Sequence, residues 1–180
     1  MARTPKTPGQ PATQPAAGRP TVAISEAVLE NSRLALEGTR WAPTEKIIYW
    51  AGVKRDALWL VTTVLRPRAA LTRGSFKTTA GDNARVIAYL SEAGLALIGQ
   101  VHTHPGRFVD HSNGDERDAF MPIENAISIV VPSYGRGGML LLTACGVHRY
   151  EGAGYRRLSD DEVNATFCVV PSTVDLSRQS

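Results

Sequence analysis

The stretch from Gln100 to Glu116, Q-V-H-T-H-P-G-R-F-V-D-H-S-N-G-D-E, decides the fold and suggests the chemistry. It follows an apolar run at residues 95–99, which predicts a buried strand. His102 and His104 stand two apart at the end of this strand, so the period of two places both imidazoles on one face. With the carboxylate of Asp115, they could supply three ligands of a metal ion and leave a fourth position for water. That ligand number is typical of a catalytic rather than a structural zinc site.

Each part of this stretch also has a simpler explanation. A single histidine near a strand end is commonly a polar residue with ordinary hydrogen-bond partners. Ser112 and Asp115 could form a cap for a helix that begins near Glu116, a reading compatible with a ligand role for Asp115. Asp110 and His111 flank the site and are expected on a solvated loop. The complete pattern, His-x-His-Pro, six residues and Ser-x-x-Asp, favours the metal site.

His102-Thr103-His104-Pro105, followed by Ser112 and Asp115, resembles the JAMM motif of the JAB1/MPN metalloproteases. That family is known for zinc-dependent removal of ubiquitin and ubiquitin-like proteins. The resemblance implies one Zn²⁺, with a bound water, on His102, His104 and Asp115. It also implies that Ser112 stabilises the oxyanion of the reaction.

The resemblance points to Glu45 as the catalytic base. In the family this glutamate opens a strand that ends in glycine seven residues later, and Glu45 and Gly52 have that spacing. The family commonly has a glycine three residues after the glutamate, where this chain has Ile48. The alternative for Glu45 is an exposed residue at the start of a strand.

Composition limits the other functions. Three basic and no acidic residues lie in the first twenty positions, and the remaining chain has 17 basic and 17 acidic residues. A neutral domain is a poor nucleic-acid binder. The sequence has no apolar run long enough for a membrane helix and no signal peptide, which predicts a cytoplasmic protein with no membrane partner. Cys145 and Cys168 are expected to be reduced thiols.

We expect a disordered Pro-rich tail at residues 1–20, one α/β domain at 21–170 and a loose tail at 171–180. The resemblance implies an MPN-type (cytidine deaminase-like) domain, a mixed sheet flanked by helices. The pattern predicts a helix capped by Ser25, and a second helix that opens at Asp82 or Asn83. Further elements predicted are a hairpin of strands 45–52 and 58–65, a basic loop at 68–73, strands at 126–131 and at 139–144 with 147–150, and a helix capped by Ser159.

The family resemblance implies as partners a ubiquitin-like protein and its conjugates. Richness in Ala, Arg and Gly favours a bacterial source. There the resemblance points to small conjugation operons with E1-like and E2-like enzymes, some of them linked to phage defence. Two alternatives stay open: a JAMM hydrolase with another substrate, such as a sulfur-carrier conjugate or a cell-wall peptide, and an inactive MPN scaffold. The complete ligand set argues against the scaffold.

Overall fold

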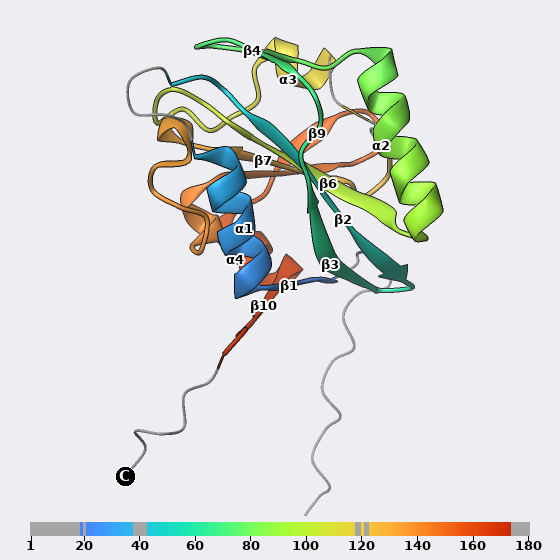
Figure 1. Ribbon diagram of the computed structural model, residues 1–180. Coiled ribbons are helices and arrows are strands. Elements are labelled where there is room, and N and C mark those ends of the chain that lie inside the picture. Colours follow the sequence, from blue (N-terminus) through green and yellow to red (C-terminus); the bar gives the residue numbers. More distant parts are fainter. Residues whose placement is uncertain (1–18, 20, 38–42, 118–119, 121–122, 174–180) are drawn as a thin grey trace, which may run out of the picture.

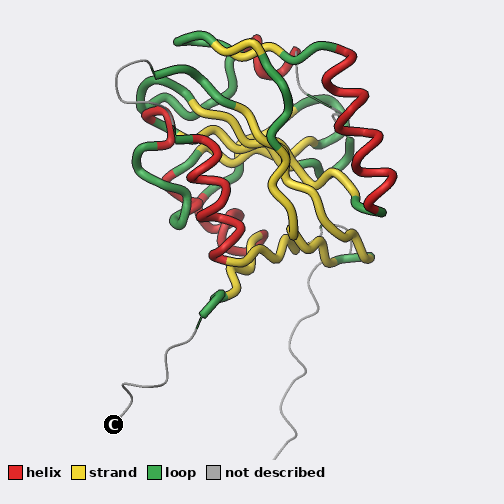
Figure 2. The backbone as a smooth tube through the Cα atoms, viewed as in Figure 1, coloured by secondary structure: helices red, strands yellow, loops and turns green. Residues whose placement is uncertain are grey.

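The computed structural model describes residues 19, 21–37, 43–117, 120 and 123–173. These residues form a curled mixed sheet with helices on both faces, which confirms the predicted fold class (Figures 1 and 2). The expected Pro-rich tail, apart from Arg19, and residues 174–180 of the expected C-terminal tail lie outside the described residues. In the described part of the chain, no helix is long and apolar enough to cross a membrane.

The main sheet has eight strands in the order β10-β1-β3-β2-β6-β7-β8-β9, and a separate two-stranded arm contains β4 and β5. The strands are β1 (Thr21–Ser25), β2 (Ile47–Arg55), β3 (Leu58–Leu65), β4 (Ala70–Leu71), β5 (Phe76–Lys77), β6 (Ala96–Thr103), β7 (Ile127–Val131), β8 (Gly146–Tyr150), β9 (Tyr155–Arg157) and β10 (Phe167–Val170). The helices are α1 (Glu26–Leu36), α2 (Ala80–Ala93), α3 (Asn113–Arg117) and α4 (Asp160–Thr166), with 3₁₀ turns at Ser133–Gly135 and Leu142–Ala144.

Both faces of the central strand β2 are buried. Ile48 and Trp50 belong to the larger core, which also includes residues of α1 and α4, whereas Ile47 and Tyr49 belong to a smaller core with α2. Successive residues of a strand point to opposite faces, so the continuous apolar run of β2 serves both layers. Figure 1 shows α1 and α4 on one side of the sheet and α2 on the other.

Several predicted boundaries were wrong. Helix α2 begins at Ala80 with Thr79 as its N-cap, because Asp82 is the N3 residue of a capping box rather than the cap itself. Strand β2 continues past Gly52, where the register shifts at a bulge. A Cβ at Gly52 would lie 1.8 Å from the carbonyl oxygen of Leu60, so this glycine permits a close approach of two backbones rather than a turn.

The remaining differences concern short elements. Residues 139–144 contain a 3₁₀ turn instead of a strand, and the predicted basic loop at 68–73 contains β4, which pairs with β5 just after the loop. The short helix α3 begins at Asn113 rather than near Glu116. Strands β9 and β10 were not predicted. Strand β10 follows α4 directly and pairs in parallel with β1, at the opposite end of the chain.

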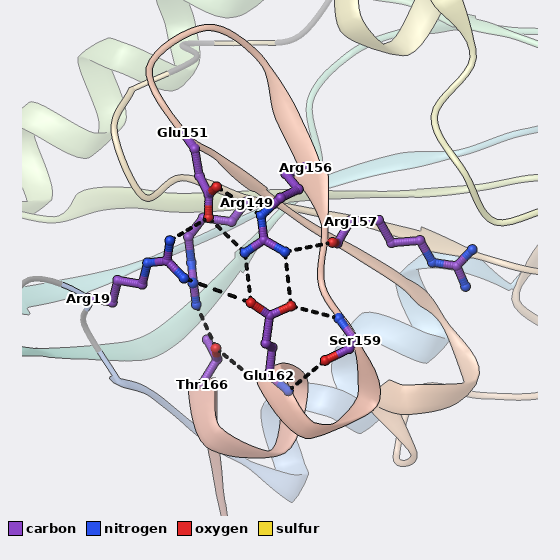
Figure 3. Close-up of polar contacts among 8 residues, drawn as sticks. All are labelled: Arg19, Arg149, Glu151, Arg156, Arg157, Ser159, Glu162 and Thr166. Atoms are coloured by element: carbon purple, nitrogen blue, oxygen red, sulfur yellow. Dashed lines mark hydrogen bonds and ion pairs between the residues drawn. The ribbon is translucent and has the colours of Figure 1, made fainter. Parts of the chain in front are cut away.

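An ion-pair network fixes the β8–β9 hairpin to α4 (Figure 3). The Arg156 guanidinium donates to both carboxylate oxygens of Glu151 and of Glu162, at 2.8–2.9 Å. Glu162 also accepts a hydrogen bond from the backbone N–H of Ser159, the N-cap of α4. The same hairpin supports the loop described below, because Arg157 points away from this network and pairs with Asp110 at 2.6 Å.

Candidate metal centre

Two histidines and one aspartate converge at the end of β6. The Nε2 atom of His102 lies 3.2 Å from Oδ1 of Asp115, and the Nε2 atom of His104 lies 3.3 Å from Oδ2. The two Nε2 atoms are 3.2 Å apart. All three side chains are buried, and their candidate ligand atoms lie within 4.8 Å of one another. Imidazole nitrogen and carboxylate oxygen are ligands that suit zinc.

The sheet positions both histidines. His102 pairs with Ile47 of β2 on one side and with Val130 of β7 on the other, so β6 is fixed along both edges. The backbone N–H of His104 donates to the carbonyl of Val131 at 2.9 Å, which extends this support beyond the strand. Pro105 then ends the extended segment. Rigid elements of this kind hold ligands more precisely than loops do.

The hydrogen bonds around His104 indicate a cation site. Its Nδ1 lies 3.0 Å from the carbonyl oxygen of Phe108, an acceptor only, so Nδ1 must carry the proton. In the neutral ring Nε2 therefore has a lone pair, and it faces a carboxylate oxygen of Asp115. The lone pair on Nε2 of the neutral His104 ring and those on the Asp115 carboxylate repel each other, and a cation between them would relieve this repulsion. The carbonyl of Phe108 is the kind of partner that commonly fixes the tautomer of a metal-binding histidine.

The electrostatics keep Asp115 and His102 in the forms that bind a metal, whereas Asp115 and the Phe108 carbonyl outweigh burial and raise the pKa of His104. Burial raises the pKa of Asp115, but its hydrogen bonds with His102 and His104 outweigh this effect and hold the pKa well below its ordinary value. Burial lowers the pKa of His102 despite the nearby carboxylate. A charged aspartate and a neutral histidine are both ready to coordinate.

Ser112 and Asp115 also form the cap predicted for the start of α3. The backbone N–H of Ser112 donates to Oδ2 of Asp115 at 2.7 Å, and the N–H of Asp115 donates to the Ser112 hydroxyl at 3.3 Å. The cap and the candidate ligand are therefore the same carboxylate. Because the Ser112 hydroxyl oxygen acts as an acceptor here, its proton is left to donate elsewhere.

Glu45 lies beside this group, in a cavity of about 340 Å³. Only 5% of the surface of Glu45 is exposed, which contradicts the alternative that it is an exposed residue at the start of a strand. Burial raises the pKa of Glu45, while His104 lowers it and Asp115 raises it. A raised pKa suits a carboxylate that must accept a proton and later release it. The cavity is lined by Glu45, His104, Ser112 and Asp115 together with Gly74, Ser75, Phe76, Pro105, Gly106, Phe108 and Gly114.

Sequence reasoning missed a cluster behind the metal ligands. His111 was expected on a solvated loop, but its ring stacks on that of His148, with centroids 3.9 Å apart and planes at 19°. Its Nε2 lies 2.9 Å from the hydroxyl of Ser128, which is fully buried. Burial and the neighbouring His148 lower the pKa of His111 to about 3. The sequence feature that could have indicated this cluster is His148, a polar residue at the centre of the short, mostly buried strand Gly146–Tyr150.

Three comparisons place the chain among known proteins. No family model matches it. It is 28% identical to the probable metalloprotease y4jG of Sinorhizobium fredii, over 64% of this chain and 74% of that protein. The solution structure of protein DSY2949 from Desulfitobacterium hafniense has a TM-score of 0.60 at 13% identity, covers 88% of this chain and 97% of its own, and shows a shared fold. A JAB1/MPN domain protein from Archaeoglobus fulgidus has a TM-score of 0.45 at 15% identity, over 83% and 97% of the two chains.

The motif and the sequence similarity agree on the kind of protein. Strand β6 carries His102, His104 follows its last residue, and the loop after them returns Asp115 to both histidines. The motif has the residue types and the spacing of the JAMM sequence, and the similar protein from Sinorhizobium fredii is a probable metalloprotease. The chain is therefore similar in sequence to a probable metalloprotease, and its motif resembles the JAMM motif of the JAB1/MPN metalloproteases.

Proposed function

We propose that this chain, a metallopeptidase of the JAMM type, hydrolyses the amide bond that follows the C-terminus of a ubiquitin-like protein. The observation that carries the proposal is the placement of Glu45 in one cavity with His104, Asp115 and Ser112. These residues come from two distant parts of the sequence and meet only in the fold. The leaving group is the ε-amine of a lysine in a conjugate or the main-chain amine of a precursor.

The walls of the cavity support an extended tail as the substrate. Gly74, Ser75 and Phe76 of the β4–β5 arm line the cavity together with residues of the motif loop. A Cβ added at Gly74 would meet nothing within 4 Å, and Gly106 is equally open. A narrow C-terminal tail can add to the edge of such an arm through its backbone, whereas a folded domain cannot enter.

The donor set fits a zinc ion, which when bound supplies Lewis acidity and a water of lowered pKa. His102, His104 and Asp115 hold and orient it. Glu45 accepts the proton of the attacking water and passes it to the leaving amine, a role that its buried, raised-pKa carboxylate suits. The hydroxyl proton of Ser112 points to the developing oxyanion, a contact typically worth about 2.7–4 kcal/mol.

This activity requires partners that attach the ubiquitin-like protein. We place the chain in a bacterial conjugation pathway with E1-like and E2-like enzymes, in the cytoplasm, and in a pathway of phage defence. The support is the family resemblance of the motif and the similarity to a bacterial protein. Neighbouring genes for an E1-like enzyme, an E2-like enzyme and a ubiquitin-like protein would give the substrate directly.

Glu45→Gln is the decisive variant. It preserves the size of the side chain and removes the proton acceptor, so folding and zinc content should be retained while turnover falls by at least the 10²–10⁴-fold typical of losing a positioned base.

Ser112→Ala should lower turnover by about 10²–10³-fold. Replacing the small residues of the substrate tail by bulky ones should block cleavage. A wild-type protein that binds zinc and a ubiquitin-like partner but never cleaves it would instead be a scaffold.

A further inference from the structure

The charges of the chain are segregated. Between positions 66 and 85 lie five basic residues and one acidic residue, while the rest of the sequence from position 21 onward has 12 basic and 16 acidic residues. A neutral total therefore conceals one strongly positive segment on an otherwise acidic domain. The segment contains the β4–β5 arm and the first part of α2.

The fold gathers four of these basic residues around two adjoining depressions. One depression, of about 230 Å³, and another, of about 550 Å³, share Arg68, Asp82 and Arg85 in their walls. Arg66 adds to the first and Lys77 to the second. All four basic side chains belong to exposed residues. We call the surface formed by Arg66, Arg68, Lys77 and Arg85 the basic face.

The basic face has little counter-charge within the described residues. Its one acid, Asp82, uses Oδ2 to accept hydrogen bonds from the backbone and the hydroxyl of Thr79, at 3.3 and 2.6 Å. The other oxygen is 3.5 Å from Arg85, whose side chain is 73% exposed. The Asp82 side chain is 11% exposed, but with an arginine this exposed and a separation of 3.5 Å the pair contributes little energy. The cations are therefore available to an external partner.

The basic face adjoins the active-site cavity. Strand β5 provides Phe76 to the cavity and the next residue, Lys77, to the basic face. The arm is fixed to the site, because the backbone N–H of Glu45 donates to the carbonyl of Thr72 at 2.8 Å and the hydroxyl of Tyr134 donates to the carbonyl of Arg73 at 2.8 Å. Figure 1 shows β4 beside α3 at one end of the molecule, with α2 running from that end.

We infer that the basic face binds an acidic surface on the folded body of the protein substrate whose tail enters the cavity. This inference rests on the proposed function. A protein is favoured over a nucleic acid because the smaller depression is also lined by the half-buried Leu65 and the exposed Tyr89. Arginine and tyrosine together are enriched at the centres of protein interfaces. The charges steer the substrate and select it against neutral or basic proteins of the same fold.

A binding experiment tests the face without any need for turnover. The probe is a fluorescein-labelled peptide of about ten glutamates, and its binding to the full chain is followed by anisotropy. Arg68→Glu and Lys77→Glu should each weaken binding by about tenfold or more at low salt, and the difference should shrink near 1 M salt, where screening acts within about 3 Å. The matched control is Arg55→Glu, the same charge change at the exposed β2–β3 turn at the far end of the sheet, which should bind as the wild type does. Equal binding by all four proteins overturns the inference, and so does tighter binding of a single-stranded oligonucleotide.

A second experiment separates the docking surface from the peptidase. Two ubiquitin-fold carriers share one C-terminal tail and a fluorogenic leaving group, and differ only in an acidic or a neutral surface next to the tail. The wild type should show roughly a tenfold higher kcat/KM for the acidic carrier, and Arg68→Glu should abolish that preference without changing hydrolysis of the free tail peptide. Cleavage of both carriers at one rate refutes the docking surface and leaves the peptidase intact. Selective binding of the acidic carrier without cleavage supports the surface and refutes the peptidase.

Discussion

Replacing His111 by leucine tests whether the loop that carries Ser112 and Asp115 is held in place by the sheet. In the wild type the His111 ring stacks on His148 and shares a hydrogen bond with Ser128 at 2.9 Å. Leucine has an apolar side chain of similar size to histidine. The change therefore removes the hydrogen bond without opening a large cavity.

The magnitude follows from the burial of Ser128. Its hydroxyl is fully buried, accepts a hydrogen bond from Nε2 of Gln100 at 3.2 Å and shares a second one with Nε2 of His111 at 2.9 Å. Without His111 the hydroxyl keeps only Gln100 as a side-chain partner among its described neighbours, and a hydrogen-bonding group left unsatisfied in a buried site costs about 1–3 kcal/mol. For a domain of this size each kcal/mol corresponds to about 2–4 °C in Tm, so we expect a decrease of roughly 4–8 °C for about 2 kcal/mol.

Thermal unfolding of the wild type, His111→Leu, Ser128→Ala and the double variant measures this coupling. The loss in the double variant should be smaller than the sum of the single losses by about 0.5–3 kcal/mol, because Ser128→Ala removes the group that His111→Leu leaves unsatisfied. Zinc affinity, measured by competition with a chelator, should fall by about tenfold in His111→Leu, as it does when the groups that orient ligands are lost. The control is Asp110→Asn, which breaks the exposed pair with Arg157 and should change Tm little.

Additive stability losses, together with an unchanged zinc affinity, would refute this reasoning. The contacts of His111 would then be incidental to the fold, and the loop would be positioned by its own cap. A loss of stability with normal zinc affinity would likewise show that the cluster supports the sheet but not the site.

The remaining predictions concern the metal, a close contact and acid stability. The purified protein should hold about one zinc per chain by elemental analysis, and His104→Ala should lose it while chelation abolishes activity. Gly146→Ala should lower the free energy of unfolding in urea by about 1–3 kcal/mol, because the new Cβ would lie 1.8 Å from the backbone oxygen of Val109. Burial lowers the pKa of His148 to about 4, below the ordinary value near 6.5, so stability should be complete above pH 6.5 and should fall as pH decreases toward 4. His148→Gln should flatten that slope, and an equally steep slope in the variant would contradict the assignment.

The sequence predicted that His102, His104 and Asp115 come together, because the placement of the two histidines depends on local geometry. The period of two in a strand is enough to place His102 and His104 on one face, and Pro105 marks where the strand must stop. The apolar residues before them leave little choice but a buried strand. Asp115 was predicted as a third ligand from its spacing to His102 and His104 in the JAMM-like motif. The structure brings its carboxylate within hydrogen-bonding distance of both histidines.

Other features depend on contacts between distant residues and gave weaker signals. Asp82 is a good capping residue, and only the reciprocal bonds with Thr79 show that it is the third helical residue instead. Glycine is common in turns, and this suggested a turn near Gly52. The structure instead needs glycine here because the carbonyl of Leu60 on the next strand leaves no room for a Cβ. His111 lies in a polar loop, and its burial depends on His148, which is 37 positions away in the sequence.

The position of Glu45 depends on the register between β2 and β6, which no local pattern specifies. Ile47 pairs with His102, and the backbone N–H of Lys46 donates to the hydroxyl of Thr103 at 2.9 Å, so the segment before β2 lies beside the metal ligands. A shift of one residue would move every side chain of β2 to the other face and exchange the residues of its two cores. Both cores contain fully buried β2 side chains, including Trp50, so such a shift is strongly disfavoured. The packing of two layers therefore fixes the position of the candidate base relative to the candidate metal site, although Glu45 and His102 are more than fifty residues apart in the sequence.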